Sequence, residues 1–122
     1  MEGQVRELER RAVRRRLDEE MRPFRRAGME KHPTDELLRS VRQVLRIPVE
    51  EIAKKVGINR SVLFSLEESE RRRSITLRSL SRVAKAMGCK VVYGVVPQGG
   101  LTLEELAEER RLMVEGAKRV SK

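Results

Sequence analysis

The stretch VEEIAKKVGINRSVLFSL, residues 49–66, decides how this chain folds. Apolar residues recur in it at the spacing of one helical face, and the repeat is interrupted at Gly57. Ala53 is small enough for two helices to cross closely, and Gly57 allows the left-handed backbone of a sharp turn. Asn59 is a favourable N-cap for the second helix. The pattern predicts two short helices joined by a tight turn and clamped by Ile52, Val56, Ile58, Leu63 and Leu66.

Helical patterns also flank this pair. One apolar face predicts a helix from Thr34, its expected N-cap, to the residue before Pro48, and another predicts a helix from Thr76 or Ser74 to Gly88. Together the patterns predict a compact bundle of four short helices. The expected inner faces hold Leu37, Leu38, Val41, Val44 and Leu45, then Val62, Leu63 and Leu66, and finally Leu77, Leu80, Val83, Ala84 and Met87.

Two further segments lie outside the bundle. The first 32 residues repeat apolar residues at helical spacing among many arginines, which predicts a long helix that ends near Pro23. The β-branched stretch CKVVYGVVP, residues 89–97, predicts a strand, and residues 101–120 predict a closing helix with Thr102 as its cap. The expected organisation is mainly α, with a helix and linker at 1–32, the bundle at 33–88, and the strand and terminal helix at 89–122.

Composition restricts the class of protein. The 122 residues carry 28 basic and 19 acidic side chains, a formal net charge of +9, with 39% hydrophobic and 39% charged residues. These fractions favour a small folded domain over a disordered tail or a membrane protein. The longest apolar stretches lie within residues 91–96, and no apolar segment follows the first charged residues, so we expect a cytoplasmic protein.

The inventory of reactive side chains argues against catalysis. Cys89 and His32 are the only residues of their types, so a Ser-His-Asp or Cys-His mechanism would have to use a histidine in the polar stretch EKHPTD. A zinc site of Cys and His ligands cannot be assembled, and the phosphate-binding pattern GxxxxGK is absent. We therefore expect no enzyme activity, no catalytic residue, no metal ion and no cofactor.

Positive charge is concentrated in the middle of the chain. Residues 54–90 hold 10 basic and 3 acidic side chains. Such a patch attracts polyanions and gains affinity by releasing their counterions, so nucleic acid is the expected partner. Because the aromatic residues are only Phe24, Phe64 and Tyr93, double-stranded DNA is favoured over unpaired RNA. Residues 14–16, all arginines, either touch phosphate or belong to a solvated helical face.

The spacing of residues 49–66 resembles the helix-turn-helix motif, and residues 35–88 resemble the lambda-repressor-like domain of the xenobiotic-response-element (XRE) family of regulators. The resemblance implies five short helices and a second motif helix that enters the major groove of DNA. It implies that the start of this recognition helix reads bases and that its surroundings bind the backbone. The base-reading candidates are Arg60, Ser61, Phe64 and Ser65, and the phosphate or minor-groove candidates are Asn59, Arg71, Arg72, Arg73 and Thr76.

Helical geometry independently gives the same base-reading face, because inward residues at 62, 63 and 66 leave 60, 61, 64 and 65 facing outward. Arg60 either pairs its planar fork with O6 and N7 of guanine or contacts phosphate. Phe64 either lies against a thymine methyl or fills a protein interface. Ser61 and Ser65 can donate or accept hydrogen bonds.

The resemblance also implies a structural ion pair between Arg42 and Glu67. The sequence departs from the family where the first motif helix begins. Members usually have Thr or Ser followed by Gln there, whereas this chain has Pro48 and Val49, whose side chains offer DNA no hydrogen bond. Affinity is therefore expected to depend more on Arg71, Arg72 and Arg73, which are expected in the loop after the recognition helix.

The sequence predicts no second strand that could pair with this one. Its backbone N–H and C=O groups would therefore stay unpaired along one edge, and such an edge tends to associate with another chain. Its pairing with the same strand of a second copy would give a homodimer with two recognition helices, as two half-sites require. The alternatives are a strand buried within the chain and a strand docked on a different protein. The residues expected at this interface are Val91, Val92, Tyr93 and Val95.

Four features together resemble the family called mobile mystery protein A: the opening helix that ends in PFRRAG, the helix-turn-helix, the run SITLRSLSRVAKAMGCKVVYGVVP and the closing helix. Members of that family are neighbours of a gene for a Fic-domain protein. The resemblance implies an autoregulating repressor, or an antitoxin-like module that binds a Fic-type partner.

Overall fold

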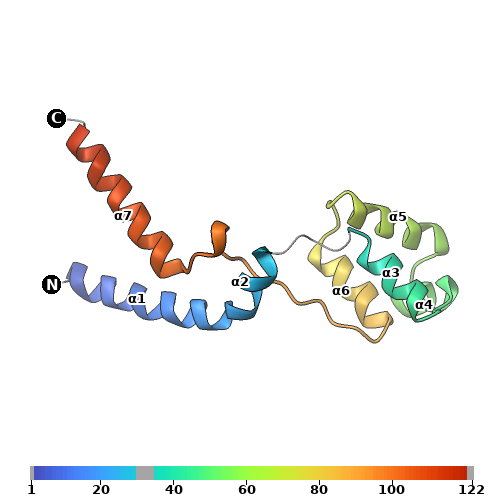
Figure 1. Cartoon of the computed structure of the whole chain (residues 1–122). Helices are drawn as coiled ribbons and strands as arrows, with labels where there is room; N and C mark the ends of the chain where they lie inside the picture. The colour runs from blue at the N-terminus through green and yellow to red at the C-terminus, as the bar shows by residue number, and fades with distance from the viewer. Residues whose placement is uncertain (1, 30–34, 121–122) are drawn as a thin grey trace. The chain divides into compact units, whose positions relative to one another are not determined.

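The protein is mainly helical (Figure 1). The structure is a computed structural model that describes residues 2–29 and 35–120. Its helices are α1 (Glu2–Glu20), α2 (Arg22–Met29), α3 (Leu37–Val44), α4 (Val49–Val56), α5 (Arg60–Arg71), α6 (Leu77–Ala86), the short 3-10 turn η1 (Gln98–Gly100) and α7 (Leu103–Val120). Within the described ranges, no helix is both long and apolar enough to cross a membrane.

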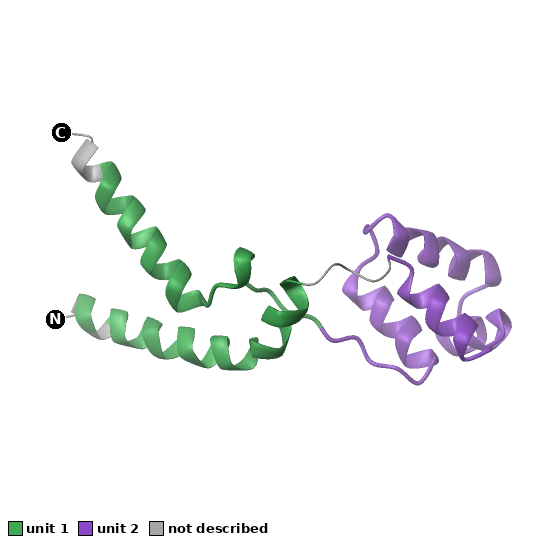
Figure 2. Cartoon of the chain, viewed as in Figure 1, with its two compact units in different colours: residues 1–31, 93–122 green, residues 32–92 purple. Residues whose placement is uncertain are grey.

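The chain divides into two compact units (Figure 2). Residues 32–92, here called the bundle unit, hold α3 to α6. Residues 1–31 and 93–122, here called the flanking unit, hold α1, α2, η1 and α7. The two ends of the chain, which the sequence presents as separate segments, therefore fold together.

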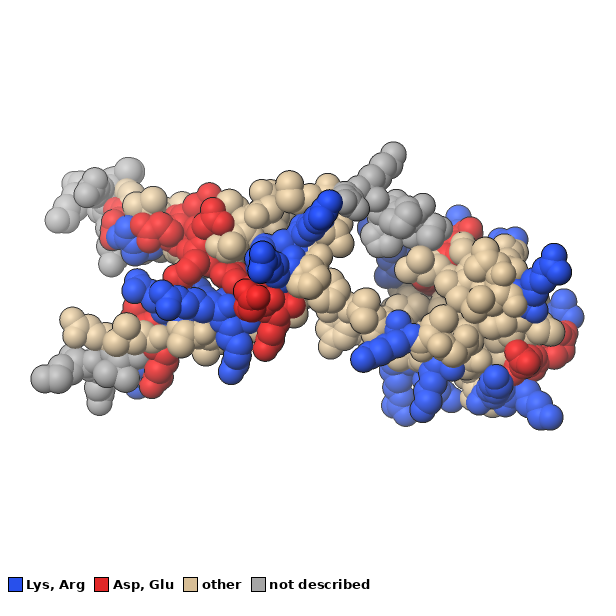
Figure 3. All heavy atoms as spheres, turned by 60° about the horizontal axis from the view of Figure 1, so that its bottom comes forward, with Lys and Arg blue, Asp and Glu red and all other residues tan. Residues whose placement is uncertain are grey.

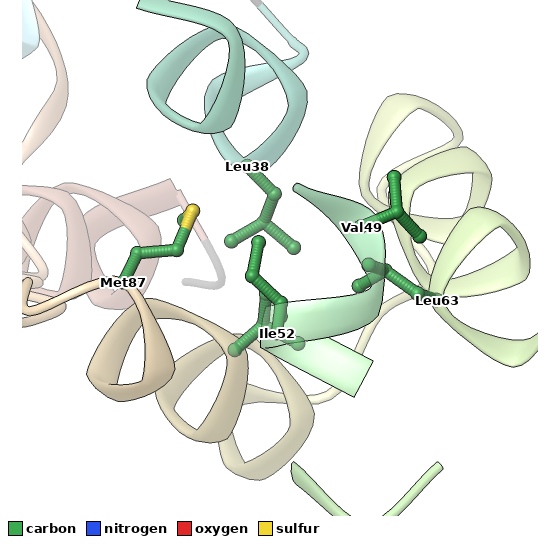
Figure 4. Packing of buried hydrophobic residues seen from close by; sticks show 6 residues of the cluster. Leu38, Val49, Ile52, Leu63 and Met87 are labelled. Atoms are coloured by element: carbon green, nitrogen blue, oxygen red, sulfur yellow. The ribbon is translucent and has the colours of Figure 1, made fainter. Parts of the chain in front are cut away.

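The core of the protein lies in the bundle unit, where all four helices contribute to it (Figure 4). Ile52 of α4 and Leu63 of α5 are completely buried, and Val83 of α6 is nearly so. Burial of each such side chain stabilises the fold by about 1.5–3 kcal/mol. The buried cluster is Leu38, Val49, Ile52, Leu63, Val83 and Met87. Four helices around one cluster agree with the predicted bundle, although the resemblance implied five.

The turn between α4 and α5 has the predicted chemistry. Gly57 ends α4 with φ of 82°, and the N–H groups of Gly57 and Ile58 both donate to the Ala53 carbonyl at 2.9 Å. The side chain of Asn59 accepts a hydrogen bond from the Val62 N–H at 2.9 Å, which caps α5. The prediction of two helices joined by a glycine turn is confirmed.

The inner faces of the helices are narrower than the sequence predicts. On α3, Leu38 is buried, whereas Leu37 and Val44 are exposed, and Leu45 beyond its end is exposed as well. Each residue turns a helix by about 100°, so only one narrow side of α3 faces its neighbours α5 and α6. Val62 is likewise 40% exposed rather than inward, because α5 buries the face of Leu63 instead.

Two buried carboxylates join α5 to α3. Glu70 accepts a hydrogen bond from the backbone N–H of Leu38 at 2.8 Å, so it satisfies a donor in the first turn of α3. One turn earlier, Glu67 forms a two-pronged ion pair with Arg42 at 2.9 and 3.0 Å. The expected cap of α3, Thr34, lies outside the described residues. The cap that the structure shows comes from a glutamate 32 positions away along the chain.

The flanking unit is built by capping and ion pairs. Asp18 of α1 accepts hydrogen bonds from the backbone N–H groups of Leu103 and Glu104 at 2.7 and 3.3 Å, which caps α7. Arg14 pairs with Glu104 next to this cap. Thr102 and Glu105 exchange hydrogen bonds in a capping box, as expected for Thr102.

The predictions outside the bundle are confirmed only in part. The first helix ends at Glu20, close to Pro23 as predicted, and Pro23 is the second residue of α2, where its missing N–H costs no helical hydrogen bond. The strand predicted at 89–97 is not seen in the single chain, whose described residues supply no neighbouring strand to accept its hydrogen bonds. Within the flanking unit, Gly94 instead lies close to Phe24 of α2. A Cβ at Gly94 would lie 2.7 Å from the Phe24 ring.

We expect Arg42→Ala to destabilise the bundle unit by about 3 kcal/mol, because the buried Glu67 carboxylate loses its partner. Urea denaturation followed by circular dichroism measures the loss. Arg39→Ala, on the exposed side of α3, is the matched control and should change the free energy of unfolding by less than about 0.5 kcal/mol. Equal losses in the two variants would show that the ion pair does not hold α5 on α3.

Candidate nucleic-acid interface

The outward face of α5 carries the four predicted base-reading residues. Its inner face is fixed by Leu63, Glu67 and Glu70, all buried. The residues Arg60, Ser61, Phe64 and Ser65 are all exposed, and they share one side of α5, next to the buried stripe, because they recur at i, i+1, i+4 and i+5. Phe64 leaves 42% of its surface exposed on this face. The structure therefore brings the four together on one surface of the helix.

Arg60 has two neighbours on this surface. Its Nη1 donates to Oε1 of Glu50 in the first turn of α4, at 2.9 Å. Its guanidinium also lies over the Phe64 ring, 5.4 Å from the ring centroid, in a cation-π contact. Phe64 thus has a packing partner within its own helix. Sequence reasoning missed Glu50, since an acidic residue in the first turn of α4 is explained equally well by the helix dipole.

The arginines at the end of α5 are each matched with a carboxylate. Arg71 is the last residue of α5 rather than part of the loop, and Arg71 and Arg72 share Glu68. Hydrogen bonding from Arg71 holds the pKa of the Glu68 carboxyl below its usual range. Arg73, with φ of 60°, pairs with Asp35 at 3.1 Å. All these pairs are exposed, so they add little stability and weaken with salt.

Asn59 and Thr76 both cap helices through a side-chain oxygen. Thr76 accepts a hydrogen bond from the Ser79 N–H at 3.1 Å at the start of α6, as Asn59 does at the start of α5. Phosphate oxygens need donors, and each capping residue keeps one, the Asn59 amide NH₂ and the Thr76 hydroxyl proton. Capping and the predicted phosphate contact are therefore compatible at both positions.

A second basic surface lies on α6, where the sequence analysis assigned no contact. Arg78, Arg82 and Lys85 recur at helical spacing, and residues 71–103 contain no acidic residue. Arg82 donates to the Val56 carbonyl at 3.0 Å, and with Lys55 and Lys85 it lines a shallow pocket against the end of α4. Figure 3 shows basic side chains gathered along one edge of the bundle unit. The spacing along α6 is the signal that would have found this surface.

No group of three or more potential metal ligands among His, Cys, Asp and Glu occurs in the part of the chain that the structure describes. Cys89 and His32 have the side-chain types most suited to binding a transition metal. Cys89 is exposed and forms no disulfide, and His32 lies outside the described residues.

Comparison with known proteins finds a similarity for the bundle unit. No curated protein and no solved structure matches the chain. Residues 38–93 match the family model described as Helix-turn-helix, a segment that begins in α3 and includes the whole of α4, α5 and α6. The matched segment thus contains the glycine turn, the outward face of α5 and the basic face of α6. The segment is therefore similar to helix-turn-helix domains, which supports a DNA-binding regulator.

Proposed function

We propose that this protein is a sequence-specific transcriptional regulator that binds DNA as a dimer and represses its own gene. The observation that carries the proposal is the exposed face of α5, which presents Arg60, Ser61, Phe64 and Ser65 within the matched helix-turn-helix segment. This face combines a planar cation, two hydroxyls and an aromatic ring, the side-chain types that read base edges in a major groove.

The contacts divide into those that read bases and those that hold the backbone. Arg60 pairs with guanine through two parallel N–H groups, and Phe64 lies against a thymine methyl. Arg72, Arg73 and Thr76 hold phosphates, and counterion release makes this second group important for affinity but blind to sequence. DNA must compete with Glu68 and Asp35 for these arginines, so the phosphate contacts exchange one anion for another.

The exposed apolar side chains of the flanking unit support the proposal that the protein is a dimer. Among its described side chains none is buried, whereas the bundle unit buries a continuous apolar cluster. Several of its apolar side chains are exposed on the helices, namely Leu8 and Val13 of α1 and Leu112, Met113 and Val114 of α7. We place the dimer contact on these helices, since residues 91–95 form no strand. A second copy would give two recognition helices for two half-sites.

Three finer attributes come from the sequence resemblance and belong to this proposal: repression, autoregulation, and the narrower likeness to the mobile mystery protein A family with its Fic-type partner. The experiment that tests the proposal uses labelled duplex from upstream of the protein's own gene, beside a scrambled duplex of equal length, across a salt titration. Preferential binding near physiological salt supports it. Equal and steeply salt-dependent binding to both duplexes would contradict it, because electrostatic contacts alone do not discriminate.

Arg60→Ala should reduce discrimination at one base pair by roughly 1–3 kcal/mol and leave other positions unchanged, because it removes a base contact. Arg72→Ala should weaken all duplexes alike and lower the slope of log K against log salt by about one unit. Fluorescence anisotropy on duplexes with single base-pair changes measures both. A uniform loss in both variants would refute the division into reading and holding residues.

Met113→Glu should convert the dimer to a monomer while the bundle unit stays folded, because it places a charge among the exposed apolar side chains of α7. Met113→Leu keeps the position apolar and should keep the dimer. Sedimentation velocity at several protein concentrations measures the state. A wild-type protein that sediments as a monomer, or a Met113→Glu variant that stays dimeric, would remove α7 from the interface.

A further inference from the structure

The side chains of Glu50, Arg60 and Phe64 form one connected group on the outward surface of α4 and α5, here called the arginine clamp. The Arg60 Nη1 group donates to Glu50 at 2.9 Å, and the Phe64 ring lies 5.4 Å from the guanidinium carbon. The two partners come from different directions, one from the first turn of α4 and one from a position four residues later in α5. They restrain both the edge and the face of the guanidinium.

We propose that Glu50 is a specificity-determining residue that positions Arg60 for base reading. The inference rests on the proposed function, because it concerns how the recognition helix discriminates between base pairs. Glu50 itself touches no base. It acts through Arg60, and Phe64 completes the restraint.

The donor arrangement of the guanidinium permits this role. Arg60 has five N–H donors in a rigid plane, and the hydrogen bond to Glu50 occupies one of them, on Nη1. The edge formed by Nε and Nη2 keeps two parallel donors, which is the pattern that O6 and N7 of guanine accept. Arg60 can therefore remain bound to Glu50 while it reads a base. A guanidinium that is already oriented loses less conformational freedom on binding than a mobile one.

Stability does not explain the pair. The Arg60 and Glu50 side chains are 64% and 66% exposed, and ion pairs at such exposure contribute little to folding. A carboxylate beside a DNA-binding face also repels phosphate and lowers affinity for every duplex. Glu50 thus opposes non-specific binding and favours the one geometry in which Arg60 gains a base contact. Both effects raise the ratio of specific to non-specific affinity.

The neighbouring Glu51 provides a matched control. It is exposed, lies in the same first turn of α4, and carries the same charge. Glu50→Gln and Glu51→Gln therefore change the net charge and the helix-dipole interaction equally. Only Glu50→Gln removes the carboxylate that holds Arg60.

The test uses the full chain and a randomised duplex library, from which the wild-type protein selects its preferred sequence. A panel of duplexes with single base-pair changes then locates the pair that depends on Arg60, as the one where Arg60→Ala loses discrimination. At that pair, Glu50→Gln should lower discrimination by about fivefold or more, with equal or higher affinity for non-specific duplex. Glu51→Gln should leave discrimination unchanged. In an Arg60→Ala background, Glu50→Gln should have no further effect on discrimination.

Two outcomes of the binding experiment overturn the proposal. Unchanged discrimination in Glu50→Gln would mean that Arg60 needs no positioning by Glu50. Increased discrimination would mean that Glu50 withholds Arg60 from DNA rather than presenting it.

A second measurement needs no DNA and separates failure of the clamp from failure of the proposed function. Nuclear magnetic resonance relaxation of the Arg60 Nε–H group reports its mobility in the unbound protein. Glu50→Gln should increase that mobility, and Glu51→Gln should not. Equal mobility in all three proteins overturns the clamp even where the wild-type protein discriminates between duplexes. A clamped Arg60 in a protein that prefers no duplex would instead refute the proposed function.

Discussion

The attachment of α5 to α3 by two buried carboxylates is the constraint on which the rest of the bundle unit depends. Glu67 and Glu70 lie on the inner face of α5, where each takes a partner from α3, the Arg42 guanidinium and the Leu38 N–H. A buried carboxylate without a partner carries a large desolvation cost, so both bonds must form together with the core. They fix the rotation of α5 about its axis more narrowly than apolar contact alone, because hydrogen bonds are directional.

That rotation decides which side chains face outward. The apolar contribution of α5 to the buried core is small, with Leu63 completely buried and Leu66 partly so. A helix held only by these residues tolerates some rotation, since apolar packing accepts neighbouring orientations at modest cost. With Glu67 and Glu70 bonded to α3, the surface of Arg60 and Phe64 is set beside the buried stripe of α5, where it stays exposed. The ion pair between Arg42 and Glu67 therefore also determines where the candidate interface lies on the bundle unit.

The sequence predicted the bundle well where local chemistry decides the structure. The glycine at position 57 and the caps at Asn59, Thr76 and Thr102 act over three or four residues, so spacing alone reveals them. The bond from Glu70 to Leu38 joins residues 32 positions apart, and no local pattern reports it. The strand expected at 89–97 is not seen for a related reason, because β-branched composition favours a strand only where a neighbouring strand is available, and the single chain provides none among its described residues. The four base-reading positions were predicted together because they share one helix, whereas their link to Glu50 crosses two helices.

The pairing of arginines in the unbound protein changes how its positive charge acts on DNA. Arg60, Arg71, Arg72 and Arg73 were all expected to contact DNA, and each already has a carboxylate partner. Their contribution to non-specific attraction is therefore smaller than a count of charges suggests, since nearby opposite charges reduce the field that a polyanion meets. On α6, by contrast, Arg78, Arg82 and Lys85 stand on a helix without acidic residues. In the proposed function, the basic residues of α6 therefore supply the attraction that any DNA sequence feels. The paired arginines leave their carboxylates only for a DNA phosphate or base at a matching position. In the proposed function, net charge attracts the protein to DNA, and the carboxylates beside α5 limit which DNA sites retain it.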